Sequence, residues 1–290
     1  MSIEYRVFDK SEDYRGALSE VAGLFAAVFR RPFPYHGWEQ WYFRNPYGPP
    51  VAILGYDGGQ LVAHHALIPQ VLARKGGERC PYMLAISTMV DDRYRDLKIF
   101  GHVVDALHKV ALARGIPFVL GFPNAKSLVP FKLMFHYRMV AQSPLCTWIP
   151  EADGAPAQVQ PIPGLSQADS EWSYPTDGTY WAWRGHSTGV RCVSVNGIME
   201  LAYKGPAAGV LTVMDLEADS TASTARGALA SFAQSTGSTA VRLTQYHAGL
   251  AGIPLNELAS HENYTVRMTC RELTRPAPRI RFSLLLSDVF

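Results

Sequence analysis

The chain has 290 residues, of which 48% are hydrophobic and 18% are charged, a composition typical of a globular protein that can bury a substantial core. Its formal net charge of +2 is too small to indicate a nucleic-acid partner or an anionic membrane surface. No apolar run reaches the ~18 residues that a transmembrane helix needs. We therefore expect neither a membrane protein nor a nucleic-acid-binding protein.

The N-terminal segment MSIEYRVFDKSEDYRG is mixed in charge and lacks the apolar core of a secretory signal. The cysteines stand far apart with no CxxC spacing, which argues against a zinc site and against a disulfide framework. They are Cys80, Cys146, Cys192 and Cys270. We expect a cytoplasmic protein with buried free thiols and no metal site.

Helices and strands alternate through the first half of the chain. Apolar residues at helical spacing predict a helix over 11–30, and a short helix is expected over 36–44, before the turn signal NPYGPP. Two strands then indicate a hairpin around DGG, with the sequences VAILGY and GQLVAHHALIPQVLARK. The remaining elements are a central strand over 82–90, a helix over 99–115, a strand over 117–122, a helix over 124–138 that breaks near Pro130, and a strand over 139–149.

Residues 150–169 are rich in Pro, Gly, Ala and Gln and have no periodicity, so they are predicted to form a linker or a long surface connection. The second half starts with the aromatic run YPTDGTYWAWRG. Its expected elements are strands over 190–195, 198–203 and 210–215, a helix over 224–235, a strand over 240–245, a short helix over 255–260, and strands over 264–273 and 280–286.

The order strand–helix–strand–helix–strand occurs in both halves, although the sequences themselves do not repeat. This order predicts two related α/β units, each with a central mixed α+β sheet flanked by helices. The expected domains are 1–149 and 172–290, joined by a linker over 150–171.

The first half resembles the GNAT superfamily of acyl-CoA-dependent N-acyltransferases in its order of elements and in residues 90–100. In that family the central strand ends in V-x-P-x-Y-R-G-x-G-I-G. The strand edge pairs with the pantetheine amide, and the glycine-rich turn holds the pyrophosphate. The positions that match are Val90, Tyr94, Arg95 and Ile99. The positions that depart from the motif are Asp92, Asp96, Lys98 and Phe100.

This resemblance implies an acyl-CoA co-substrate, acetyl-CoA or another, bound along the strand end and the turn. The implied binding residues are Met89, Val90, Arg95, Asp96, Leu97, Lys98, Ile99, Phe100, Asn124 and Phe131. Loss of two glycines restricts the approach of a diphosphate, and Asp96 adds repulsion. Arg95 and Lys98 can offset this by direct charge pairing. The alternative is a degenerate fold that no longer binds CoA.

Residues 121–137, GFPNAKSLVPFKLMFHY, resemble the pattern G-F-P-N-x-x-S-x-x-x-F-x-x-x-G-W of a GNAT branch often encoded with polysaccharide and nucleotide-sugar pathways. In that pattern Asn124 contacts the acyl-CoA side of the cleft. Phe131 stands where many GNAT enzymes have the tyrosine that protonates the leaving thiolate. The segments WYFRNPYG and LVAHHALIP resemble the acceptor side of this branch, and YWAWRGH with the final LLLSDVF resembles its second, degenerate GNAT-like domain.

The catalytic candidates lie on the hairpin and the central strand. N-acylation needs a general base, for which histidine is well suited. Alternation along a strand lets only one of His64 and His65 face a cleft, and we prefer His65. Ser87 can relay a proton through water, and Asp91 can act as a base or hold a cationic amine. The structural alternatives are a packed histidine, a serine bonded to the backbone, and an aspartate paired with arginine.

The stretch FRRPFPYHGWEQWYFRNPYG supplies aromatic and basic side chains for an acceptor such as a nucleotide-linked amino sugar. The candidates for substrate binding are Arg31, Trp38, Trp41, Tyr42 and His64. The alternative for each aromatic ring is that it packs a helix on the sheet.

The sequence therefore predicts an N-acyltransferase that moves an acyl group from acyl-CoA directly to a primary amine, since no nucleophile constellation is evident. Its expected partner is a small-molecule amine, with no nucleic acid or membrane, and a homodimer is left open. Two competing hypotheses are an inactive GNAT-fold binding or scaffold protein and an aminoacyl-tRNA-dependent transferase.

Overall fold

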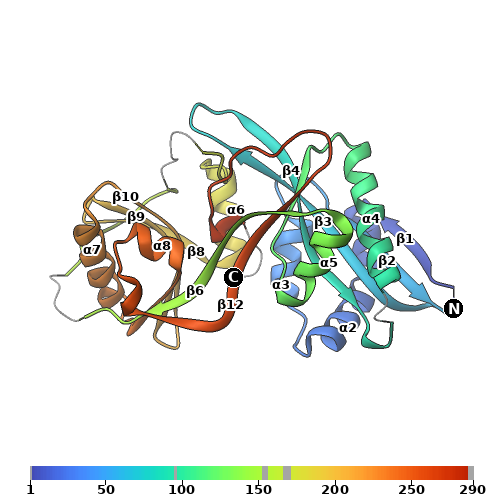
Figure 1. The fold of residues 1–290 in the computed structure, drawn as a ribbon, viewed down its shortest axis with the longest axis horizontal. Helices are drawn as coiled ribbons and strands as arrows, with labels where there is room; N and C mark the ends of the chain where they lie inside the picture. The colour runs from blue at the N-terminus through green and yellow to red at the C-terminus, as the bar shows by residue number, and fades with distance from the viewer. Residues whose placement is uncertain (1, 95–96, 152–155, 166–170, 287–290) are drawn as a thin grey trace. The chain divides into compact units, whose positions relative to one another are not determined.

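The computed structural model describes residues 2–94, 97–151, 156–165 and 171–286, which form two compact units (Figure 1). The first unit comprises Met1–Leu72, Arg79–Val140 and Met268–Pro278. The second comprises Ala73–Glu78, Ala141–Arg267 and Arg279–Phe290. Neither unit is a continuous segment, and the domain limits at 149 and 172 stay predictions.

The first unit contains a mixed sheet with strands in the order β1-β2-β3-β4-β5-β12. Its strands are β1 (Glu4–Phe8), β2 (Val51–Asp57), β3 (Gln60–Ala73), β4 (Arg79–Val90), β5 (Phe118–Gly121) and the end of β12 (Leu258–Glu272). β4 and β5 are parallel, whereas β1–β2, β2–β3 and β5–β12 are antiparallel pairs. The hairpin predicted around DGG is β2–β3, and the predicted central strand is β4.

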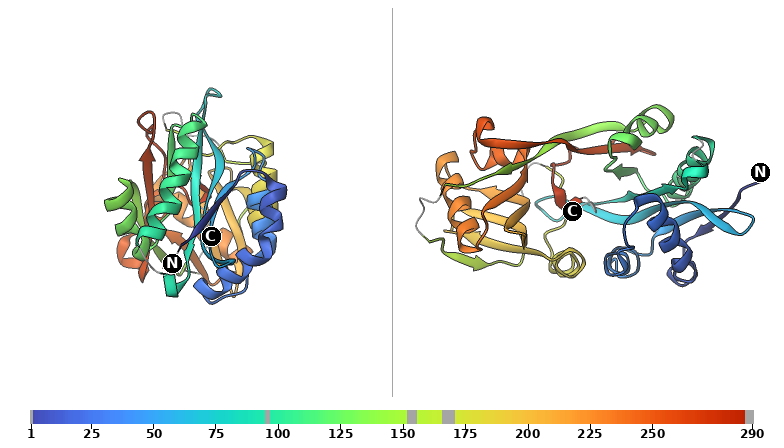
Figure 2. Two further views of the ribbon diagram at one scale, coloured as in Figure 1. Left: turned by 90° about the vertical axis from the view of Figure 1, so that its right-hand side faces the viewer. Right: turned by 90° about the horizontal axis from the view of Figure 1, so that it is seen from below.

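Helices cover both faces of this sheet, as Figure 2 shows in its right-hand view. They are α1 (Ser11–Gly16), α2 (Leu18–Phe29), α3 (Tyr35–Trp38) with a π-helical turn at Glu39–Phe43, α4 (Leu97–Ala113) and α5 (Ala125–Phe135). On the face of α4 and α5, Ile53, Ala63 and Leu67 of the sheet pack against Val103 and Leu107. On the other face, Tyr14 of α1 and Trp38 of α3 lie against β3.

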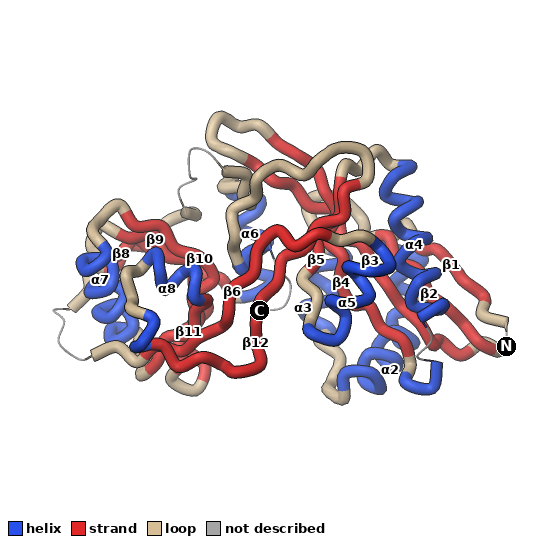
Figure 3. Tube along the Cα trace, viewed as in Figure 1, coloured by secondary structure: helices blue, strands red, loops and turns tan. Residues whose placement is uncertain are grey.

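The second unit repeats this order of elements, and Figure 3 shows the same alternation of strand and helix. Its sheet order is β6-β11-β10-β9-β8-β7, with β10 and β11 parallel. The strands are β6 (Arg138–Trp148), β7 (Val159–Pro161), β8 (Val190–Val195), β9 (Met199–Ala207), β10 (Val210–Ala218) and β11 (Ala240–Thr244). The helices are α6 (Gly178–Thr188), α7 (Ala222–Ser235) and α8 (Gln245–Leu250). Leu211, Val213 and Leu243 pack against Leu229 and Phe232 of α7 to form its core.

Several elements differ from their sequence prediction. The helix expected over 11–30 is divided at Ala17, and α5 runs through Pro130 because Asn124 caps its start while Phe131 and Phe135 anchor its end in the core. The segment predicted as a strand over 280–286 instead contains a 3-10 turn at Leu284–Leu286.

Other differences concern short elements of the second half. The helix expected over 255–260 is a 3-10 turn at Leu255–Glu257 that leads into β12. The sequence missed α6, α8 and the short strand β7 within the predicted linker. Within the described ranges of the chain, no helix is both long and apolar enough to cross a membrane.

Candidate active site

A bulge at Ser87 changes the side-chain alternation of β4. Before it, Met83 and Ala85 pack on the face of α4, and after it Val90 packs on that same face. Ser87 has a φ of +51°, a left-handed conformation uncommon for a residue with a side chain. One extra residue at this point moves Thr88, rather than Ser87, onto the face of α4.

His65 lies fully buried on the same face of the sheet as Ala63 and Leu67, as the alternation of β3 predicts. Its Nδ1 is 2.8 Å from Thr88 Oγ1, and its Nε2 has no hydrogen-bond partner among the residues that the structure describes. Burial lowers the pKa of His65 well below 6.5, and the nearby His108 and His64 lower it further. The imidazole is therefore neutral near pH 7.

His64 faces the opposite side of the sheet and is held by two hydrogen bonds. Its Nε2 is 2.8 Å from the Tyr14 hydroxyl, and its Nδ1 is 2.7 Å from the carbonyl oxygen of Ser87. Since a carbonyl only accepts, the proton is on Nδ1, and the Tyr14 hydroxyl donates to Nε2. Trp38 Nε1 in turn donates to the Tyr14 oxygen at 3.2 Å. Burial lowers the pKa of His64 to about 4, so this histidine is a neutral structural link.

The parallel pairing of β4 and β5 ends where the bulge begins. Met83 pairs with Val119, and Ala85 pairs with Gly121, the last residue of β5. β4 continues to Val90, so its last five residues extend beyond β5. Those residues include Ser87, Met89 and Val90, which the sequence places in the site. Met89 is buried, and Val90 contributes to the core below α4.

The charged turn after β4 is held by an ion pair within the turn and by a hydrogen bond to β2. The Asp91 carboxylate accepts hydrogen bonds from Arg93 Nε at 3.1 Å and Nη2 at 2.9 Å, and this guanidinium lowers the pKa of Asp91. The Tyr94 hydroxyl donates to Asp57 at 2.8 Å. Asp91 thus makes the arginine pair that the sequence left open as the alternative to a base. Arg95 and Asp96 lie outside the described residues.

Helix α4 begins at Leu97, of which only the backbone is described. Lys98 is exposed, whereas Ile99 is buried in the core. The ring of Phe100 lies edge-to-face against Phe131, with 5.6 Å between centroids. The side chains of Ile99 and Phe100 therefore pack in the first unit, and only the backbone groups of these two residues could contact a ligand.

Asn124 is the N-cap of α5, and its side-chain oxygen accepts from the backbone N–H groups of Lys126 and Ser127, both at 3.0 Å. Phe131 is buried against Phe100 and Tyr137, so the proton-donating tyrosine of many GNAT enzymes has an apolar counterpart here.

A buried polar pair close to Phe131 was missed by the sequence analysis. The Tyr137 hydroxyl is 2.9 Å from His108 Nε2. Burial raises the pKa of Tyr137 well above 10 and lowers the pKa of His108 to about 4. His108 occupies a helical position where apolar residues recur, and Tyr137 follows α5, so neither residue carried a signal in the sequence.

The aromatic candidates for substrate binding lie inside the first unit. Trp38 and Tyr42 stack with 4.3 Å between centroids, and both are buried, as is Trp41. Their rings therefore pack the helices on the sheet, the alternative that the sequence left open. Arg31 is exposed, and its guanidinium lies 5.2 Å from the centroid of the Phe25 ring.

No group of three His, Cys, Asp or Glu side chains able to hold a metal ion occurs in the part of the chain that the structure describes. All four cysteines are free.

Residues 14–139 match the family model of the acetyltransferase (GNAT) domain. No curated protein has a sequence significantly similar to that of this chain. The fold, in contrast, has many counterparts among solved structures, and those described next have low sequence identity to this chain.

A probable N-acyltransferase from Enterococcus faecalis V583 is 12% identical, with a TM-score of 0.64 over 94% of this chain and 73% of its own. A GCN5-related N-acetyltransferase from Kribbella flavida is 16% identical, with a TM-score of 0.63 over 94% of this chain and 72% of its own. A tandem GNAT protein from the clavulanic acid biosynthesis pathway is 10% identical, with a TM-score of 0.62 over 95% of this chain and 100% of its own. These structures confirm the predicted α+β fold of tandem GNAT type.

Proposed function

We propose that the first unit is an acyl-CoA-dependent N-acyltransferase that moves an acyl group directly to a primary amine. The match of residues 14–139 to the GNAT domain supports the reaction class. The observation that carries the proposal is the buried, neutral His65 beside the bulge of β4, with Nε2 left without a partner among the described residues. A buried polar atom of this kind costs free energy unless something binds it.

His65 has the chemistry of a general base. When its Nδ1–H donates to Thr88 Oγ1, the Nε2 atom carries the lone pair and can accept a proton. Thr88 then fixes the ring orientation. Because His65 is fully buried, we propose that it takes the proton of the amine through one intervening water. Asp91 is a weaker candidate, since both of its carboxylate oxygens accept hydrogen bonds from the Arg93 guanidinium.

The residues present fit an acyl-CoA in part. The end of β4 that extends beyond its pairing with β5, Thr88–Val90, offers backbone groups for the pantetheine amide and for the thioester oxygen. Lys98, exposed in the first turn of α4, and Arg95 are proposed to pair with the pyrophosphate in place of the glycines. Bound there, an acyl-CoA would supply the activated acyl group.

The acceptor is proposed to be a small primary amine, with a nucleotide-linked amino sugar as the first class to test. Its support is the resemblance of residues 41–48, 61–69 and 121–137 to the sugar-pathway branch. The rings of Trp38, Trp41 and Tyr42 do not add support, because they are buried. The free cysteines suit the reducing cytoplasm, which we propose as the compartment.

The first test is binding of acetyl-CoA and CoA, measured by calorimetry and by thermal unfolding. Ligand at 100 times Kd should raise the free energy of unfolding by about 2.7 kcal/mol. Lys98→Ala should weaken binding, whereas Lys109→Ala, on the same helix and paired with Asp105, should not. No binding of any acyl-CoA would refute the proposal.

The second test is acyl transfer to a panel of primary amines, with release of free CoA as the readout. His65→Gln should lower kcat by about 10²-fold or more and leave CoA affinity unchanged. Equal activity of His65→Gln and the unmodified protein would remove His65 as the base.

Two observations favour a second candidate, a catalytically inactive GNAT-fold binding or scaffold protein that no longer binds CoA. Phe131 stands at the position of the proton donor, and Asp96 and Lys98 replace the glycines of the turn. No binding of CoA or acetyl-CoA, together with no transfer to any amine, would support this second candidate.

A further inference from the structure

We infer that residues 279–286 form a strap that closes the second unit's counterpart of the acyl-CoA site, so that the chain takes one acyl-CoA. The existence of the strap is argued from contacts within the second unit. The statement that one acyl-CoA binds per chain rests on the proposed function.

The equivalent position in the second unit follows from strand register and from side-chain packing. In the first unit the parallel pair β4–β5 ends at Ala85–Gly121, and the bulge at Ser87 follows. In the second unit the last pair of β10 and β11 is Thr212–Arg242, and the register of β10 against β9 then shifts between Val213 and Asp215. Leu216 packs on the face of α7, as Thr88 lies on the face of α4, so Leu216 corresponds to Thr88. Asp215, one residue earlier and within the register shift, corresponds to the bulge residue Ser87.

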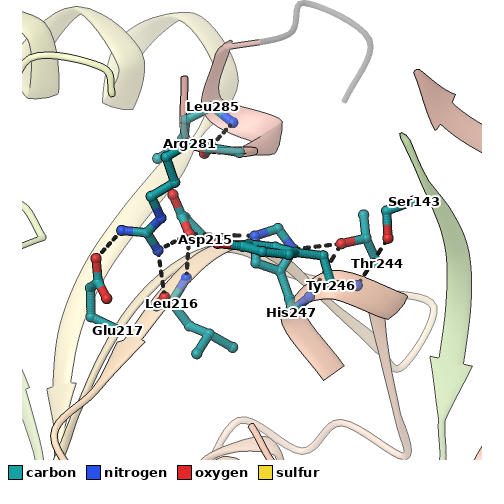
Figure 4. A network of polar contacts seen from close by, with 10 residues as sticks. Ser143, Asp215, Leu216, Glu217, Thr244, Tyr246, His247, Arg281 and Leu285 are labelled. Atoms are coloured by element: carbon teal, nitrogen blue, oxygen red, sulfur yellow. Dashed lines mark hydrogen bonds and ion pairs between the residues drawn. The ribbon is translucent and has the colours of Figure 1, made fainter. Parts of the chain in front are cut away.

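Asp215 is fully buried at the centre of a polar network (Figure 4). Its Oδ1 accepts from Leu216 N at 2.8 Å and lies 3.4 Å from His247 Nε2. His247, on α8, has its Nδ1 2.9 Å from Thr244 Oγ1 at the end of β11. The network thus joins β10 to β11 and α8 at the point where the two strands separate.

The strap completes this network with a buried guanidinium. Arg281 Nη2 donates to Asp215 Oδ1 at 2.9 Å and to the Leu216 carbonyl at 2.8 Å, and Nη1 pairs with Glu217. The backbone N–H of Arg281 donates to Trp172 at 2.8 Å, and the buried turn Leu284–Leu286 packs against β10. The end of β10 is therefore covered by the chain's own residues.

Charge also disfavours an anionic ligand at this position. Asp215 and Glu217 carry two negative charges, and Arg281 supplies one positive charge that is already used in pairing. The first unit has the neutral Ser87 at the place equivalent to Asp215. A CoA pyrophosphate would have to displace the strap and then meet two uncompensated carboxylates.

The test combines hydrogen exchange with calorimetry on the full chain. Arg281→Ala should make the amides of 279–286 and of the end of β10 exchange at least about tenfold faster. Arg279→Ala is the matched control, because Arg279 is exposed and pairs with Glu171. In this variant the amides of 279–286 and of the end of β10 should exchange as in the unmodified protein. Equal exchange in the two variants would overturn the strap.

Arg281→Ala could prevent folding of the second unit, because it leaves the charge of the buried Asp215 without its partner. A second variant is designed for that case. Asp215→Asn with Arg281→Met removes both charges together. In this variant the strap should exchange at least about tenfold faster while β9 and β10 stay protected. Unchanged protection of the strap would overturn the inference.

Calorimetry with CoA then gives the number of ligands per chain. We expect one for the unmodified protein, and two would overturn the closure of the second site. If no CoA binds, the proposed function fails, whereas the strap is still judged by hydrogen exchange.

Discussion

His64 and His65 are neighbours on β3 whose side chains meet different environments. His64 bridges Tyr14 and the Ser87 carbonyl, so both of its ring nitrogens are used. His65 uses one nitrogen on Thr88 and keeps the other available. Adjacent residues of the same type thus divide into a structural link and a chemical candidate because a strand alternates its faces.

Tyr14→Phe tests the structural link. The change leaves His64 Nε2 and Trp38 Nε1 buried without their partner, so the free energy of unfolding should fall by about 1–3 kcal/mol. Urea unfolding measures this loss. The control is Tyr35→Phe, which removes a hydroxyl from an exposed ring and should cost less than about 0.5 kcal/mol. Similar losses for the two variants would contradict the network.

The buried histidines also predict how stability depends on pH. Burial lowers the pKa of His64 and of His108 to about 4, against 6.5 in the unfolded chain. Above pH 6.5 both histidines are neutral in both states. As pH falls from 6.5 to 4 the unfolded chain gains protons first, so the free energy of unfolding falls by up to roughly 3 kcal/mol per histidine.

Urea unfolding at pH 7, 5.5 and 4.5 checks this slope. His108→Gln should make it shallower, because glutamine does not titrate. Leu112→Gln, a change between two side chains that do not titrate at an exposed position of the same helix, should leave it unchanged. A slope that is the same in His108→Gln and in the unmodified protein would contradict the assignment.

At the scale of elements, regular segments were predictable and irregular ones were not. The alternation of β3 placed His65 correctly with Ala63 and Leu67, because the strand is regular there. The bulge at Ser87 was not foreseen, since a serine with positive φ leaves no mark in the sequence. It is this bulge that brings Thr88, and not Ser87, to His65.

Helix α5 shows how tertiary contacts override a local signal. Pro130 predicted a break, yet the helix continues because buried side chains hold it beyond the proline. Helix α6 was not predicted. It lies in an aromatic run whose rings are buried, and this run was interpreted as a family motif rather than as the apolar face of a helix. The sequence also could not show that Trp38 and Tyr42 are buried, because an aromatic side chain is equally suited to binding a ligand and to packing in a core.

The N-cap of α5 gives a prediction at this scale. Asn124→Ala removes the acceptor for the N–H groups of Lys126 and Ser127 and should lower the free energy of unfolding by about 1 kcal/mol. Asn124→Asp keeps an acceptor at a helix N-terminus and should lose little. Thermal unfolding of both variants decides the matter, and equal losses would show that the amide group has another role.

At the scale of the whole molecule, the two units are interleaved in sequence. Residues 268–278 belong to the first unit, where Thr269–Glu272 of β12 pair with β5. Arg138 also pairs with Glu272 at 2.9 Å. Sequence reasoning expected the first domain to end at 149, because pairing between distant strands carries no local signal.

A fragment of residues 1–149 tests this organisation. It lacks the strand beside β5, so we expect an exposed strand edge, aggregation and no cooperative unfolding transition. Adding residues 150–290 as a second chain should restore the transition, measured by circular dichroism during thermal unfolding. A monomeric fragment that unfolds cooperatively would support a self-contained domain over 1–149 instead.

The late position of the last strand of the first unit matters for synthesis on the ribosome. Residues up to Val140 emerge well before Met268, and at about 5–20 residues per second this interval lasts on the order of ten seconds. During that time β5 lacks β12, its antiparallel neighbour, and the nascent chain presents an open sheet edge at β5. The half of the protein that is made first is therefore completed only after most of the second unit has been made, and it relies on the unfinished edge staying unpaired until residues 268–278 arrive.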